Sequence, residues 1–271
     1  MNGQSSMLLH AGIDNAIHQL ERVIPAYAAG KLTEPHHPHA IAVLFRRLGA
    51  CRLLTTGEAE PLLTAQMQSA SAYLHRLPQV SEEDKVTSRA GAWWDAIGGE
   101  YWEAAFEIAR HSRSAPNPTW EHEDDFLFVW FLMTRYFLDD GGVAAEQRQR
   151  LLLDRWDAVL AGAYDPRRLL CDSLLRRDPR GFHASLAEVG EHREALLRQQ
   201  LSERQLPQED AVWTLPFWPE GLALLRLAER DGMPIDAHQR GVPQVVQGPN
   251  PYEYNGQAWL DIEYQPSPRR C

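Results

Sequence analysis

Carboxylates gathered in two short stretches are the residues of this sequence whose type and spacing come closest to a catalytic pattern. Paired carboxylates perform general acid–base chemistry when burial separates their pKa values. The two acidic clusters consist of Glu82, Glu83, Asp84, Glu121, Glu123, Asp124 and Asp125. Both are expected at helix starts or on exposed faces, where acidic residues stabilise the positive end of a helix or are simply solvated. We therefore predict that they form a surface rather than a catalytic site.

A histidine-rich segment offers the best candidate metal ligands. His36, His37 and His39 stand among prolines, and the side chains of His37 and His39 would point the same way in an extended segment. No second ligand pair follows at helical spacing, and the metalloprotease pattern that begins at His122 fails because Phe126 stands where the second histidine is needed. We expect a solvated histidine loop without metal, with a metal site as the alternative.

Nucleophiles and cofactor motifs give little further chemistry. The sequence contains no GxSxG, no GxxxxGK[ST] and no GxGxxG. Its cysteines, Cys51, Cys171 and Cys271, are widely spaced and form no CxxC pair, which is typical of buried thiols in a reducing compartment. A Cys171–His183 pair is the alternative. We therefore predict no catalytic residues, no cofactor and no enzymatic activity.

Helices must position all of these residues, because helical periodicity dominates the sequence. Ile13, Ile17, Leu20 and Ile24 recur at spacings of three and four, which predicts the buried face of a first helix. Prolines, glycines and apolar spacing delimit the others. Further helices are expected over residues 39–54, 61–74, 93–98, 101–109, 119–138, 144–161, 166–175, 180–201 and 220–230, with one more opened by 81–89.

The segment 119–138 should be the central helix. Thr119 can cap it, the second acidic cluster complements its dipole, and the apolar run FLFVWFLMTRYFL predicts burial on most sides. No β–α alternation or period-two pattern is present. The fold class is therefore all-α, with roughly nine to eleven helices packed as antiparallel pairs.

We expect a single domain over residues 1–240, with a subdivision near 113–119 as the alternative. Residues 241–271 are rich in Pro, Gly and Asn and should form an irregular tail packed on the domain. Three apolar residues are expected to hold the tail and one short strand is allowed there: Trp259, Ile262 and Tyr264.

Charge and hydropathy limit the partners. The chain of 271 residues has a net charge of −10, which argues against nucleic-acid binding and permits steering toward a basic protein. Charge interrupts the apolar residues of the N-terminal segment, so no signal peptide is expected. The longest apolar stretch, 126–138, is too short to cross a bilayer. We predict a cytoplasmic protein that contacts neither nucleic acid nor membrane.

A short internal pattern suggests a helical-repeat adaptor. Residues 94–101 (WDAIGGEY) match the opening of a tetratricopeptide repeat, but Arg110 stands where the second helix of that repeat needs Ala. The nine tryptophans are mostly expected in the core, where large rings fill helix junctions, and one or two could instead anchor a partner.

The C-terminal half contains a characteristic succession of aromatic residues, helix lengths and turns. It comprises LLRRD at 174–178, FHASLAE at 182–188 and the polar helix EHREALLRQQLSER at 191–204. It ends with WTLPFWPEGLALLRLAERDGMPI at 213–235, where a helix leads into a Gly-x-Pro-Ile turn. Over about residues 145–245 this layout resembles the helical immunity proteins of bacterial polymorphic toxin systems, most closely the Imm49-type family.

The resemblance implies a non-catalytic inhibitor that protects a cell from a toxin. Its partner would be a cognate toxin or secreted effector acting in the cytosol, such as a nuclease with a basic cleft, and the inhibitor would occlude that active site. The seven carboxylates of the two clusters are our predicted toxin interface. A helical-repeat adaptor or scaffold is the second hypothesis, and an all-α enzyme using the acidic or histidine clusters is the third.

Overall fold

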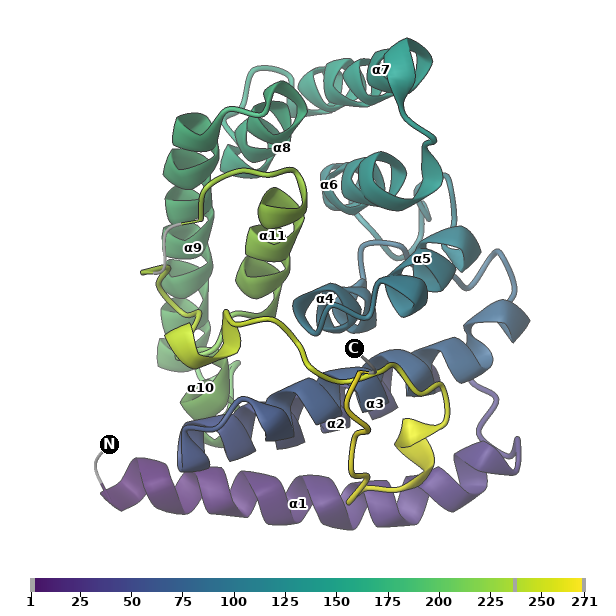
Figure 1. The fold of residues 1–271 in the computed structure, drawn as a ribbon, viewed down its shortest axis with the longest axis vertical. Helices are drawn as coiled ribbons and strands as arrows, with labels where there is room; N and C mark the ends of the chain where they lie inside the picture. Colours follow the sequence, from purple (N-terminus) through teal and green to yellow (C-terminus); the bar gives the residue numbers. More distant parts are fainter. Residues whose placement is uncertain (1–2, 236–237, 270–271) are drawn as a thin grey trace.

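The computed structural model describes residues 3–235 and 238–269, and over these ranges the chain is built from helices (Figure 1). The only β-pairing in this part of the chain is one antiparallel bridge, between Tyr252 and Pro268. The all-α prediction is therefore confirmed. Cys271 lies outside the described residues.

Eleven α-helices follow one another along the described chain. They are α1 (Gly3–Ala28), α2 (His37–Thr56), α3 (Glu60–Arg76), α4 (Gly91–Gly98), α5 (Trp102–His111), α6 (Glu123–Met133), α7 (Gly142–Leu160), α8 (Pro166–Arg176), α9 (Pro179–Ser202), α10 (Gln208–Thr214) and α11 (Pro219–Arg230). A π-helical turn, Thr134–Leu138, follows α6, and short 3-10 turns occupy Leu77–Gln79, Gln244–Val246 and Ala258–Leu260.

Helices α1 to α3 form a layer at one end of the molecule, with α2 packed against both neighbours (Figure 1). Of the apolar face predicted for the first helix, Leu20 and Ile24 are buried, and Ile13 and Ile17 are half-buried. Leu20 lies in an enclosed cluster with Tyr27 and Phe45. Gly49 allows α2 to approach α3 closely, because a Cβ atom there would lie 2.4 Å from the Cβ of Ala65.

Helix α6 and its neighbours continue the core beyond this layer. Phe126, Leu127 and Phe131 are completely buried, as expected for the central helix. The helix begins at Glu123, however, with His122 in extended conformation before it, so the prediction that Thr119 caps it was wrong. Glu123, Asp124 and Asp125 do lie in the first turn of α6, where they complement the helix dipole, whereas Glu121 lies before the helix.

The segment 81–89 forms turns instead of the expected helix. The side chains of Lys85 and Thr87 are buried, and the Thr87 hydroxyl donates to the carbonyl of Arg113 at 2.8 Å. This tertiary contact fixes the segment against the loop before α6. On α7, Leu153 and Trp156 are buried, whereas Val159 is 38% exposed.

The C-terminal tail is irregular, as predicted, and buried polar side chains attach it to the helices. Arg226 of α11, 3% exposed, donates to the carbonyls of Val246, Gln247 and Gly248. Trp259 is 2% exposed and confirms the prediction that it holds the tail. Within the described ranges, no helix has the length and apolar character needed to cross a lipid bilayer.

Candidate functional site

The structure joins the two loops that carry the acidic clusters. Asn117, 2% exposed, donates from Nδ2 to the carbonyls of Glu83 at 2.8 Å and Lys85 at 3.0 Å. The Glu121 carboxylate accepts the backbone N–H of Ser88 at 2.8 Å and that of Asn117 at 2.7 Å. Loops that are separate in the sequence are therefore in contact, and Glu121 and Asn117 connect them.

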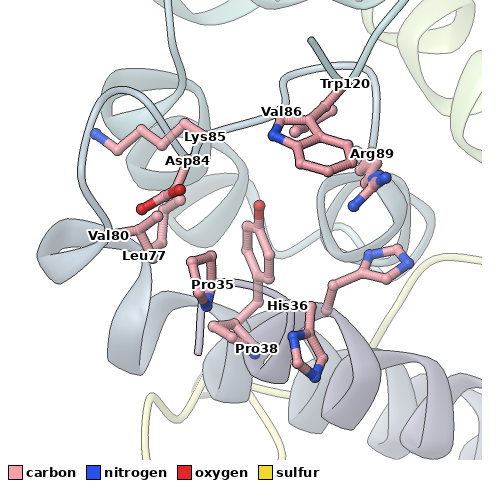
Figure 2. A pocket seen from close by; sticks show the side chains of 12 residues that line it. Pro35, His36, Pro38, Leu77, Val80, Asp84, Lys85, Val86, Arg89 and Trp120 are labelled. Atoms are coloured by element: carbon pink, nitrogen blue, oxygen red, sulfur yellow. The ribbon is translucent and has the colours of Figure 1, made fainter. Parts of the chain in front are cut away.

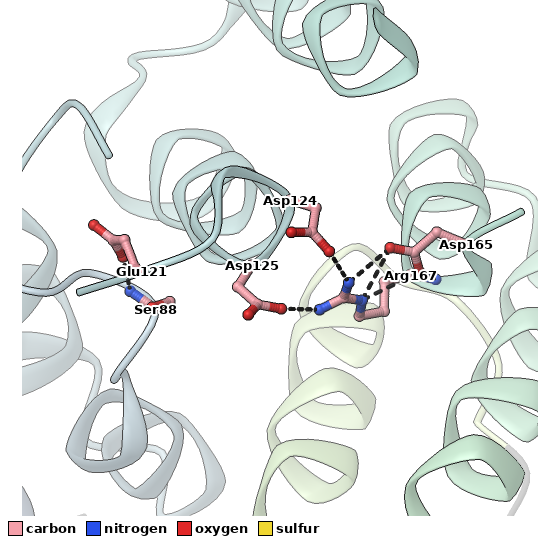
Figure 3. A network of polar contacts seen from close by, with 6 residues as sticks. All are labelled: Ser88, Glu121, Asp124, Asp125, Asp165 and Arg167. Atoms are coloured by element: carbon pink, nitrogen blue, oxygen red, sulfur yellow. Dashed lines mark hydrogen bonds and ion pairs between the residues drawn. The ribbon is translucent and has the colours of Figure 1, made fainter. Parts of the chain in front are cut away.

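The acidic residues at the start of α6 are largely satisfied within the chain. The guanidinium of Arg167 on α8 contacts Asp124 at 2.8 Å, Asp125 at 2.5 Å and Asp165 at 2.8 Å (Figure 3). Burial alone would lower the pKa of Arg167, but the hydrogen bonds that it donates to Asp165 and Asp125 outweigh burial and raise this pKa. These carboxylates hold α6 to α8.

Glu123 completes this pattern through an ion pair of 2.6 Å with Arg155 on α7. Each of the four predicted interface residues between 121 and 125 thus has a partner in the chain. Their carboxylates serve the packing of α6 in this structure, and their availability to a second protein is correspondingly reduced.

The acidic residues of the first cluster differ, because they face solvent. Glu82 is 69% exposed and pairs with Lys85. Asp84 accepts a hydrogen bond from the Ser81 hydroxyl at 2.8 Å, and the Glu83 side chain forms no ion pair with any described residue. We call these residues, 82–84, the acidic loop.

A pocket of about 250 Å³ lies beside the acidic loop (Figure 2). Its walls are mostly apolar, and a few polar side chains converge on it, as in ordinary ligand sites. It is lined by Pro35, His36, Pro38, His39, Tyr73, Leu77, Val80, Asp84, Lys85, Val86, Arg89 and Trp120. These residues come from the start of α2, the end of α3 and the two joined loops.

Two polar residues of the pocket lining, His39 and Tyr73, have shifted pKa values. Burial, aided by the positive charges of Arg46 and Arg89, lowers the pKa of His39 to about 4. Burial likewise raises the pKa of the Tyr73 hydroxyl to about 12. Both groups are therefore neutral near pH 7 and can form hydrogen bonds without carrying charge.

The histidine segment does not adopt the expected extended conformation. His37 begins α2, and its Nδ1 accepts the N–H of Glu34 at 3.0 Å, whereas His36 and His39 line the pocket. Burial, and next the neighbouring His36, lower the pKa of His37. The prediction that His37 and His39 point the same way was based on the wrong conformation. Among the described residues, no group of three His, Cys, Asp or Glu side chains could hold a metal ion.

Trp120 is the residue that sequence reasoning missed. Its side chain is 59% exposed at the edge of the pocket, opposite the acidic loop (Figure 2). A large indole that gains so little from folding is a candidate binding anchor, because tryptophan is enriched among interface hot spots. The signal available in the sequence was a tryptophan directly after the Pro-rich loop 114–118, but the helix expected over 119–138 included it.

Three other candidate residues, Trp94, Tyr101 and Cys171, are part of the core, whereas His183 is half-buried. Trp94 and Tyr101 of the repeat-like pattern are 4% and 1% exposed. Cys171 is completely buried, and burial raises the pKa of its thiol, which keeps it protonated. His183 contacts the carbonyl of Pro234 through Nε2 at 2.9 Å.

Comparisons with known proteins add no assignment. No protein-family model matches the sequence, and neither the curated proteins nor the solved structures give a match. The functional argument therefore depends on the site itself.

Proposed function

We propose that this chain is a bacterial immunity protein that binds and neutralises a cognate toxin or secreted effector in the cytoplasm. It would act without catalysis, by covering the active site of the toxin. The binding surface would be the Trp120 face, which we define as Trp120, the acidic loop 82–84 and the pocket between them. The observation that carries the proposal is an indole exposed by 59% that lies across a pocket from the solvent-facing acidic loop (Figure 2).

The charges of this face suit a basic partner such as a nuclease. A net charge of −10 would accelerate the approach of a basic cleft, and the acidic loop would stand in for the phosphates that such a cleft binds. Charged residues at an interface rim mainly set the association rate, whereas a desolvated aromatic anchor supplies affinity. The acidic loop would therefore set the association rate, and Trp120 would supply most of the affinity.

Co-expression tests the proposal. The gene adjacent to the one that encodes this chain is expressed in a bacterial host, with and without this protein. We expect the neighbour to be toxic alone, and this chain to restore growth and to co-purify with it. A neighbour that is harmless, or toxicity that persists, would refute the immunity function.

A charge-reversed variant locates the surface. The triple substitution Glu82→Lys, Glu83→Lys and Asp84→Lys should abolish rescue and co-purification. The matched control carries the same charge change at exposed positions elsewhere: Glu191→Lys, Glu203→Lys and Glu209→Lys. Rescue by both variants would exclude the acidic loop while leaving the immunity function standing.

A further inference from the structure

We propose that the pocket beside Trp120 binds a small monocarboxylate with an aromatic or aliphatic body, held by Arg89, Tyr73 and His39. This inference does not depend on the immunity function, because it concerns the isolated chain and a small ligand. It follows from the size of the pocket, from its apolar walls and from the uneven distribution of its charges.

The size and walls define the body of the ligand. An apolar cavity of about 150 Å³ holds benzene, so a pocket of about 250 Å³ has room for roughly ten non-hydrogen atoms. Pro35, Leu77 and Val80 present apolar surface, and the exposed indole of Trp120 closes one side (Figure 2). A single ring with a short chain matches this space.

The charges define the polar end of the ligand. Arg89 lines the pocket and forms no ion pair with any described residue. Arg46 also contributes positive potential, but Asp95 holds its guanidinium through contacts at 2.8–3.1 Å. Arg89 is therefore the cation of the pocket wall that is free to bind an anion. Arginine presents donors in a planar fork that matches a carboxylate.

Neutral hydrogen-bonding groups supplement Arg89. The Tyr73 hydroxyl makes no hydrogen bond to a described residue, and the His39 imidazole is uncharged near pH 7. The hydroxyl can donate to a carboxylate oxygen, and so can the N–H of a neutral imidazole. Such bonds to an ionised acceptor are stronger than those between neutral groups.

The acidic residue of the lining, Asp84, does not cancel the preference of the pocket for an anion. Figure 2 places Asp84 on the side of the opening opposite Arg89 and Trp120, and Asp84 already accepts the Ser81 hydroxyl. The Lys85 ammonium points away from the opening and pairs with Glu82. The charged groups that shift the pKa of His39 are Arg46 and Arg89, so the charge beside this imidazole is positive and disfavours a cationic ligand there.

Three probes with the same body test the proposal. Binding of 3-phenylpropionate, 3-phenylpropanamide and 3-phenylpropylammonium to the full chain is measured by calorimetry and by ligand-observed NMR. We expect the carboxylate to bind at least about tenfold more tightly than the amide, and the ammonium to bind most weakly. Equal binding of carboxylate and amide, or preference for the ammonium, would overturn the proposal, as would no binding of any probe at millimolar concentration.

Variants assign the preference to the pocket. Arg89→Gln should remove the advantage of the carboxylate over the amide, and Tyr73→Phe should reduce it. Arg180→Gln is the matched control, since Arg180 is exposed on α9, forms no ion pair with a described residue and is not part of the pocket. If folded Arg89→Gln still binds the carboxylate more tightly than the amide by the same factor, Arg89 does not hold the carboxylate and the proposal is refuted.

The same chemistry could come from the C-terminus of a protein chain. An acetylated tetrapeptide ending in Phe is therefore compared with its C-terminal amide. Tighter binding of the peptide acid than of 3-phenylpropionate would identify a chain terminus as the source, and the reverse would identify a free small molecule. A peptide amide that binds as well as the acid would count against carboxylate recognition.

Discussion

The two acidic clusters look alike in the sequence but have different physical roles. Residues 121–125 are held by Arg155, Arg167 and backbone N–H groups, whereas the acidic loop 82–84 faces solvent with one lysine partner. The difference arises because the first turn of α6 packs against α7 and α8, which supply arginines, while the loop packs through its backbone. The density of acidic residues in the sequence therefore did not show which cluster packs against arginines and which faces solvent.

Removing Arg167, which pairs with the aspartates at the start of α6, should have the largest effect on stability. Arg167→Ala leaves Asp124, Asp125 and Asp165 facing one another, and the Asp165 side chain is only 8% exposed. We expect the free energy of unfolding to fall by about 3 kcal/mol, the lower end for a broken buried pair, because Arg167 is itself 26% exposed. Urea denaturation measures the change.

The control for that variant is Arg155→Ala. Its pair with Glu123 is exposed on both sides, so the free energy of unfolding should change by no more than about 0.5 kcal/mol. Equal losses in the two variants would mean that the arginine side chains act through packing rather than through the carboxylates.

Substitution of the exposed indole should separate binding from stability. Trp120→Ala should leave the free energy of unfolding within about 0.5 kcal/mol, because the side chain is 59% exposed. The dissociation constant for the cognate toxin should rise about 30-fold, equivalent to about 2 kcal/mol for a hot-spot residue. Titration calorimetry against the purified partner measures it. Undiminished affinity would remove Trp120 from the proposed interface.

Substitution of Asn117, which joins the two loops, should lower the free energy of unfolding by an intermediate amount. Asn117→Ala removes the Nδ2 donors to the carbonyls of Glu83 and Lys85 and should cost about 1.5 kcal/mol. Amide hydrogen exchange should accelerate in residues 81–89 and remain unchanged in α8. Protection that persists in 81–89 would show that Thr87 and Glu121 alone hold the loops together.

The smallest effect is the change in the pKa of His39 when Arg89 is replaced. Because the pKa of His39 lies at about 4, below its ordinary 6.5, the unfolded chain binds a proton that the folded chain does not. The contribution of His39 to stability is therefore lost as the pH falls from about 6.5 toward about 4. NMR titration should show that Arg89→Gln raises this pKa slightly, since Arg89 is exposed and screened, and that Glu83→Gln leaves it unchanged.

Local rules predicted most of the helices. Pro166 and Pro179 begin α8 and α9, and the preceding aspartates accept backbone N–H groups, Asp165 from Arg167 at 2.9 Å and Asp178 from Arg180 at 3.1 Å. Such signals lie within a few residues of one another and can be read directly. α10 was missed because its seven residues, between Pro207 and Pro216, are too few for a periodic pattern.

The candidate site could be predicted only in part. Its acidic and histidine residues were recognised by type, but the pocket is assembled from the start of α2, the end of α3 and two loops. The contact that joins the loops, from Asn117 to Glu83 and Lys85, is between residues distant in sequence and leaves no local pattern. Because the carbonyls of Glu83 and Lys85 accept these bonds from Asn117, residues 81–89 form turns instead of the expected helix.

The attachment of the tail bears on how the protein is made. The Trp259 ring packs against the rings of Tyr27 and His75, with centroids 5.3 Å and 4.7 Å away. A ribosome delivers the N-terminal helices first, so the contact surface on α1 and α3 stays uncovered until the last part of the sequence has emerged. The first layer of the fold is therefore completed only after Trp259 has been synthesised, and the growing chain passes through a stage in which this aromatic surface is open to other proteins.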